Sequence, residues 1–284
     1  MLEQKQGKRG NMQKVQSRRA AMAVFCLPLY GFLLLHATAQ TPAQPADDPA
    51  SSVKSAPLAL DDVVRNLQQK NAERAAALEE FGGTRVYRMQ YRGIPSDHDA
   101  EMVVTMTFHS PAAKQFSIVS QTGSKFIVDH VFMKLLEGEQ EAASPENRRR
   151  TALSTENYDF ALAGYESSPD GGRYILDLLP KTKNKFLYRG KIWVDDKDFA
   201  VVHIEGEPGK NPSFWIKKTE IDHRYVKVDD FWLPAENHTE SVIRLGGRAI
   251  LNIEYKDYKI TRATALPVEN AREDSRSSPA MGIR

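Results

Sequence analysis

Residues 186–205 read FLYRGKIWVDDKDFAVVHIE. On either side of Asp195-Asp196, β-branched and aromatic residues alternate with polar ones, first over residues 186–195 and then over residues 199–205. Alternation with a period of two, interrupted by adjacent turn residues, is typical of half-buried strands joined by a short turn. This stretch therefore predicts an antiparallel hairpin.

The same alternation continues on both sides of this hairpin. Its interruptions carry turn residues, as at Pro169-Asp170-Gly171-Gly172, Pro208-Gly209 and Gly246-Gly247. Consecutive strands with short turns indicate an antiparallel meander, here of about ten strands. The further predicted strands are 84–92, 101–109, 115–121, 158–166, 174–180, 214–226, 231–243 and 248–260.

Two segments have helical spacing instead. In residues 61–81 apolar side chains recur every three or four residues, with Asp61 or Asp62 as candidate N-cap and Gly82-Gly83 as the predicted end. Residues 129–143 are a second, shorter amphipathic segment. A sheet of ten twisted strands curls, and helices laid against its inner face enclose an apolar space. We expect these two segments to be covering helices.

The N-terminus has the order of a secretory signal. Residues 1–20 carry six basic residues and one acidic residue, an apolar run follows to about His36, and Ala37-Thr38-Ala39 ends it. We expect cleavage after Ala39 and a periplasmic location; an uncleaved inner-membrane anchor is the alternative, since the apolar run nearly suffices to span a bilayer.

Composition predicts a single domain behind this leader. Residues 40–59 are rich in Pro, Ala, Ser and Asp and predict a flexible linker, whereas 60–268 predict the folded domain and 269–284 a disordered tail. Without the leader the chain has 33 Lys and Arg residues against 36 Asp and Glu residues, a net charge of −3. Nucleic acid is therefore not an expected partner.

Motifs for catalysis or metal binding are absent from the sequence. The single cysteine, Cys26, lies in the leader, which excludes disulfides and thiolate metal sites in the mature chain. The seven histidines lack ligand spacing, His130 beside Asp129 being the nearest candidate pair, and no G-x-S-x-G motif occurs. We expect no enzyme, cofactor or metal; a hydrolase assembled from scattered residues remains the alternative.

Three stretches resemble a known family. Lys191-Ile192-Trp193-Val194-Asp195, Phe231-Trp232-Leu233-Pro234 and Tyr255-Lys256-Asp257-Tyr258 resemble strand and turn signatures of the LolA-like outer-membrane lipoprotein-sorting proteins, and the likeness covers most of residues 61–262. The resemblance implies a mainly β (α+β) fold: a curled antiparallel sheet, or incomplete β-barrel, of about eleven strands with covering helices. Its hollow would accept acyl chains.

The leading hypothesis is thus a non-enzymatic, monomeric periplasmic protein that binds or carries lipid or acylated lipoprotein cargo, with a membrane protein as possible donor or acceptor. The alternative is a signalling or scaffold module of the same fold that binds a membrane protein. Two basic runs, 148–150 and 181–185, either meet lipid headgroups or an acidic partner surface, or form solvated loops.

Apolar residues of the predicted strands are the candidate ligand-binding residues. They either line the hollow or fill a solid core, because a one-residue error in register reverses the two faces of a strand. These candidates are Val104, Met106, Phe108, Phe116, Ile118, Leu176, Leu178, Ile192, Trp215 and Leu251.

Overall fold

The computed structural model describes residues 57–111, 113–168 and 171–263. The predicted signal peptide (1–39), most of the predicted linker (40–59) and the predicted tail (269–284) lie outside these residues. No helix in the described part is both long enough and apolar enough to cross a membrane.

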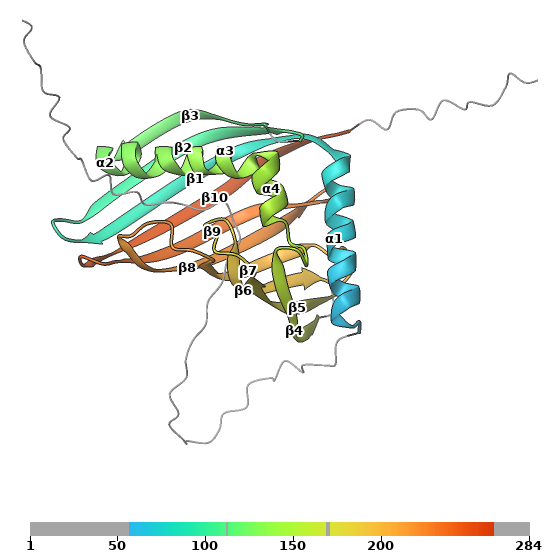
Figure 1. Ribbon diagram of the computed structural model, residues 1–284. Coiled ribbons are helices and arrows are strands. Elements are labelled where there is room, and N and C mark those ends of the chain that lie inside the picture. The colour runs from blue at the N-terminus through green and yellow to red at the C-terminus, as the bar shows by residue number, and fades with distance from the viewer. Residues whose placement is uncertain (1–56, 112, 169–170, 264–284) are drawn as a thin grey trace, which may run out of the picture.

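The described residues form one antiparallel sheet of ten strands, with the order β3-β2-β1-β10-β9-β8-β7-β6-β5-β4. The sheet curls without closing, so β3 and β4 are its two edges (Figure 1). Its strands are β1 (Leu78–Gly93), β2 (His98–His109), β3 (Ala113–Gly123), β4 (Tyr158–Ser168), β5 (Gly171–Pro180), β6 (Tyr188–Asp195), β7 (Val201–Pro208), β8 (Ile216–Val228), β9 (Phe231–Ile243) and β10 (Gly247–Arg262).

The expected mainly β, curled sheet is confirmed. Each predicted strand has a counterpart, and the opening hairpin is β6 and β7, in which Ile192 lies opposite Ile204. The resemblance implied about eleven strands, and the described part of the chain has ten. Apart from the β1–β10 pair, which joins the first and last strands, neighbouring strands follow one another along the chain, as in a meander.

The helical elements are few. Three of them, α2, η1 and α3, are one continuous segment with a π-helical turn in its middle, and Ser124 caps its start by accepting a hydrogen bond from the Ile127 amide at 3.5 Å. The elements are α1 (Leu60–Ala77), α2 (Lys125–Ile127), η1 (Val128–Phe132), α3 (Met133–Ala143) and α4 (Pro145–Thr151).

Three predictions about the helices are wrong in detail. The first helix ends at Ala77, and residues 78–83 are strand because Phe81 lies between Ile260 of β10 and Phe108 of β2, so sheet pairing overrides the helical period. Its N-cap is Ala59, without a side-chain cap. The basic run 148–150 belongs to α4, capped by Ser144, and not to a loop.

Two apolar clusters make up most of the core of the described residues. The α3 cluster joins the α2–η1–α3 segment to β1, β2 and β10 and to one end residue each of β8 and β9. The α1 cluster joins α1 to strands β4 to β7. In Figure 1, α1 crosses one end of the sheet, whereas the α2–η1–α3 segment runs along the strands of the opposite half. Each half of the sheet thus has its own helical cover.

Candidate functional site

A row of directly paired residues crosses the covered face from β2 to β4. Paired residues of antiparallel strands lie on the same face, so the row shows what that face offers. Its two ends are apolar, and its centre, on β8 and β9, is polar. The row consists of Met102, Tyr87, Ile253, Asn237, His223, Ile204, Ile192, Leu176 and Leu162.

Six of the ten predicted ligand-binding residues divide between the two clusters. Val104 and Leu251 belong to the α3 cluster, and Phe116 packs against it. The α1 cluster contains Leu176, Leu178 and Ile192.

The other four predicted residues lie outside both clusters. Met106 is buried and Phe108 is half-buried, Trp215 is half-buried in the loop before β8, and Ile118 on the edge strand is 44% exposed. The structure therefore does not bring the ten residues together around one site, and their role in binding stays a prediction.

A buried cluster of charges fastens α3 to the sheet. Glu139, on α3, is 4% exposed and forms an ion pair with Arg85 of β1, which is 3% exposed. Lys114 of β3 lies 3.0 Å from the same carboxylate oxygen, and the Tyr87 hydroxyl donates to the other oxygen at 2.9 Å. Two cations and one anion leave this cluster with a net charge of +1.

The protonation states of the cluster follow from its geometry. Burial acts to raise the pKa of Glu139, but Arg85 and Lys114 outweigh it and hold that pKa at about 2. Burial lowers the pKa of Lys114, while Glu139 opposes this effect. Burying a carboxylate without a counter-charge would cost much free energy. Glu139 can therefore point from α3 toward the sheet only because the sheet supplies two positive charges.

Sequence reasoning missed this cluster although one signal was present. In residues 84–92, Arg85 has the same parity as Tyr87 and Met89, so alternation places it on the apolar face of its own strand. A charged residue in that position calls for a buried partner. The sequence contains no comparable signal for Glu139, because many acidic residues flank the helix.

The central polar residues form a second buried group. His223 is fully buried and Asn237 is 5% exposed; the Asn237 amide nitrogen lies 3.3 Å from His223 Nδ1. Burial lowers the pKa of His223 well below its ordinary value, so the ring is neutral. The Tyr255 ring lies 6.0 Å from the His223 ring, and the Arg85 guanidinium lies 5.0 Å from the centre of the Tyr255 ring.

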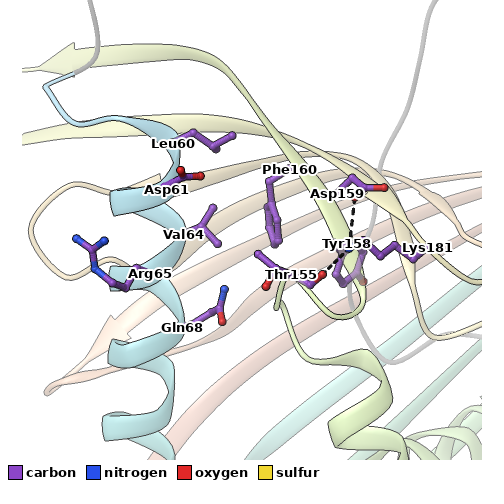
Figure 2. Close-up of a pocket in the computed structure, with 10 residues that line it drawn as sticks. All are labelled: Leu60, Asp61, Val64, Arg65, Gln68, Thr155, Tyr158, Asp159, Phe160 and Lys181. Carbon is purple, nitrogen blue, oxygen red and sulfur yellow. Dashed lines mark hydrogen bonds and ion pairs between the residues drawn. The ribbon is translucent and has the colours of Figure 1, made fainter.

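A separate pocket of about 480 Å³ lies between α1 and the edge strand β4 (Figure 2). Leu60, Val64 and Phe160 form its apolar wall, and Lys181 lies 3.4 Å from Asp159 at its charged side. None of the ten predicted ligand-binding residues lines this pocket. None of its lining residues belongs to the paired row or to the charge cluster.

One group on the opposite face has metal-ligand chemistry. His203, Glu205 and Asp222 offer ligand atoms that all lie within 4.8 Å of one another. The sequence did not predict this group, because Asp222 comes from the neighbouring strand. His203 Nε2 lies 3.0 Å from Asp222, which Arg224 also contacts, so ion pairing within the protein already accounts for the arrangement.

A serine–histidine contact is present but lacks a third member. Ser96 Oγ lies 3.1 Å from His98 Nε2 in the exposed turn after β1. The adjacent carboxylates have other contacts: Asp97 accepts from the Gly93 amide at 3.0 Å, and Asp99 pairs with Arg92. Since a catalytic serine needs a base that is itself oriented, this contact does not form a triad.

No protein-family model matches the sequence, and no curated protein matches it. Solved structures similar to the chain include a DUF1329 family protein from Desulfovibrio piger (11% identity, TM-score 0.36, covering 71% of this chain and 92% of that chain). A second is a putative outer membrane lipoprotein-sorting protein domain from Vibrio parahaemolyticus (12% identity, TM-score 0.35, 74% and 96%). A third is a LolA superfamily protein from Nitrosomonas europaea (12% identity, TM-score 0.31, 72% and 94%).

At these identities no residue role transfers from any of the three proteins to this chain. The architecture of the site rests on the sheet order and on the contacts described above. Solved structures similar to the chain thus include DUF1329, LolA superfamily and outer-membrane lipoprotein-sorting proteins.

Proposed function

We propose that this chain is exported to the periplasm and binds or carries a lipid or acyl-chain cargo between the curled sheet and its covering helices, without bond-making chemistry. One observation carries the proposal: α3 covers an apolar part of the sheet but is fastened there by a buried charge cluster. A helix attached in this way can separate from the sheet and expose the apolar surface beneath it.

The energetics of acyl chains favour such a device. Each methylene moved from water into an apolar site contributes about 0.8 kcal/mol, so a lipid crosses an aqueous compartment slowly unless a protein encloses its tails. The apolar residues that face the α2–η1–α3 segment, among them Met89, Met102 and Leu251, are suited to this purpose because methionine adapts to irregular shapes.

The predicted signal peptide supports the location of this function. A leader that is cleaved after Ala39 would release a free carrier, and an uncleaved leader would hold the domain at the inner membrane. The charge of −3 without the leader and the absence of catalytic motifs are consistent with a carrier.

Binding of a membrane protein is the second candidate function. The edge strand β3 supports it, because Ile118 is 44% exposed and Val119 is 63% exposed along an edge free to pair with an added strand. In this case the sheet would act as a scaffold, and no lipid would be required.

Native mass spectrometry with lipid extraction tests the proposal on protein purified from a periplasm. We expect phospholipid or acylated peptide to be retained at a fixed stoichiometry. A mass of the protein alone, with no uptake of added lipid, would refute the carrier function. Strand addition at β3 would then be tested with Val119→Lys, which should abolish partner binding.

A further inference from the structure

Three buried hydrogen-bond donors near the charge cluster have no hydrogen-bond partner among the described residues. They are Arg85 Nε, the Tyr255 hydroxyl and His223 Nε2. Each residue is at most 6% exposed. A buried donor without a partner costs free energy, so the presence of three such donors in one region suggests that something absent from the chain accepts from them.

The hydrogen bonds of His223 determine that its free nitrogen is a donor. The Asn237 carbonyl oxygen accepts from the Thr239 hydroxyl at 2.8 Å, which turns the Asn237 amide nitrogen toward His223 Nδ1. Nδ1 therefore accepts. A neutral ring with an accepting Nδ1 carries its proton on Nε2, so all three free groups are donors.

These donors lie in one electrostatic neighbourhood. Tyr255 lies between the other two, with its ring 6.0 Å from the His223 ring and 5.0 Å from the Arg85 guanidinium. The charges of Arg85 and Glu139 act on both Tyr255 and His223. The charge cluster beside these donors has a net charge of +1, and its one carboxylate, Glu139, belongs to the cover α3.

From this arrangement we infer that the face beneath α3 recognises an anionic head, a phosphate or carboxylate, on the acyl-chain ligand. In the ligand-free protein Glu139 occupies that anion site. The incoming head replaces it between Arg85 and Lys114 and accepts from the free donors. This inference rests on the proposed function and deepens it, since it makes α3 a cover that an anionic amphiphile releases.

Isothermal titration of the full-length chain with three probes tests the inference. Dodecyl phosphate carries the anionic head, hexaethylene glycol monododecyl ether carries the same tail with an uncharged head, and inorganic phosphate carries the charge without the tail. We expect dodecyl phosphate to bind at least tenfold more tightly than the ether. Inorganic phosphate should bind at least a hundredfold more weakly than dodecyl phosphate.

Four variants separate recognition of the head from opening of the cover. Glu139→Gln should raise the preference for dodecyl phosphate over the ether at least tenfold, because the internal competitor loses its charge. Lys114→Met should lower the preference for dodecyl phosphate about tenfold. Lys134→Met, on the exposed side of α3, should leave that preference unchanged. Tyr255→Phe removes only the free hydroxyl and should weaken dodecyl phosphate about fivefold without lowering the melting temperature.

The possible contrary results have distinct meanings. Equal affinity for both dodecyl probes in the wild type and in Glu139→Gln would overturn the inference and leave the carrier function standing. Inorganic phosphate binding as tightly as dodecyl phosphate would overturn the lipid head as the source of the anion. An unchanged affinity of Tyr255→Phe would overturn the role of the free donors in recognising the head, because buried water would then satisfy them. No binding of either dodecyl probe would overturn the carrier function as well.

Discussion

The two halves of the sheet hold their helices in different ways. In the α1 half, Val63, Val64 and Leu67 bury apolar side chains, and Arg74 donates to the carbonyl oxygens of Asp198 and Phe199 at 2.8 and 3.0 Å. In the α3 half, apolar contacts are joined by the buried ion pair of Glu139.

The difference indicates which helix can open. Apolar contacts weaken only when water or another apolar surface replaces them, and the α1 half depends on them. A buried ion pair is worth little net stability against well-packed apolar residues, yet the loss of one partner is costly. The α3 half is therefore sensitive to any charge that competes with Glu139. We accordingly regard α1 as a fixed part of the core and α3 as the cover.

The largest expected effect is that of Glu139→Gln. Removing the carboxylate leaves the buried Arg85 and the partly buried Lys114 without a counter-charge, at a cost of about 3–5 kcal/mol. Opening of α3 relieves this cost, so amide hydrogen exchange in residues 133–143 should lose about 100-fold in protection while α1 keeps its protection. The control is Glu137→Gln, which affects only an exposed pair with Lys134. Equal loss of protection in both helices would contradict the comparison.

Leu67→Ala should have the next largest effect. It should destabilise the whole domain, whereas Glu139→Gln should open one helix. Leu67 is fully buried in the α1 cluster, and its truncation should lower the free energy of unfolding by about 3 kcal/mol. Because α1 belongs to the core, denaturant unfolding should remain a single transition with a lower midpoint. Gln69→Ala on the exposed side of α1 serves as the control. Selective opening of α1 with the sheet intact would show that α1, too, is a detachable cover.

The smallest expected effect concerns His223, which lies between the halves. Its pKa is lowered in the folded protein, so the unfolded chain takes up a proton below about pH 6.5 that the folded protein refuses. Stability should then fall with pH from that point, by at most about 1.4 kcal/mol per pH unit.

Urea unfolding at pH 7 and pH 5 measures this loss. The variant His223→Gln should no longer lose stability between pH 7 and pH 5. The control His130→Gln, at an exposed position, should lose as much stability as the wild type. An unchanged pH dependence in His223→Gln would mean that the buried ring does not resist protonation.

The sequence was sufficient for most of the sheet. Alternation predicted all ten strands, because most of them have one buried face and are joined by short turns. It misplaced the end of the first helix, since the pairing of Phe81 with two strands is non-local and leaves no local signal.

The candidate site was less predictable. The apolar candidates were taken from strand faces, but their division into two clusters depends on where the helices dock. Arg85 could have been found from its parity within its strand. The partners Lys114 and Glu139 could not, because they meet Arg85 only after β3 and α3 have packed. The tautomer of His223 likewise depends on contacts between strands.

The most direct test of the account is hydrogen exchange on the full-length chain with and without dodecyl phosphate. It compares the amides of residues 125–143 with those of residues 60–77. The ligand should lower protection across residues 125–143, because it displaces Glu139, and should leave the protection of residues 60–77 unchanged. Unchanged or increased protection of residues 125–143 in the ligand-bound protein would contradict the account.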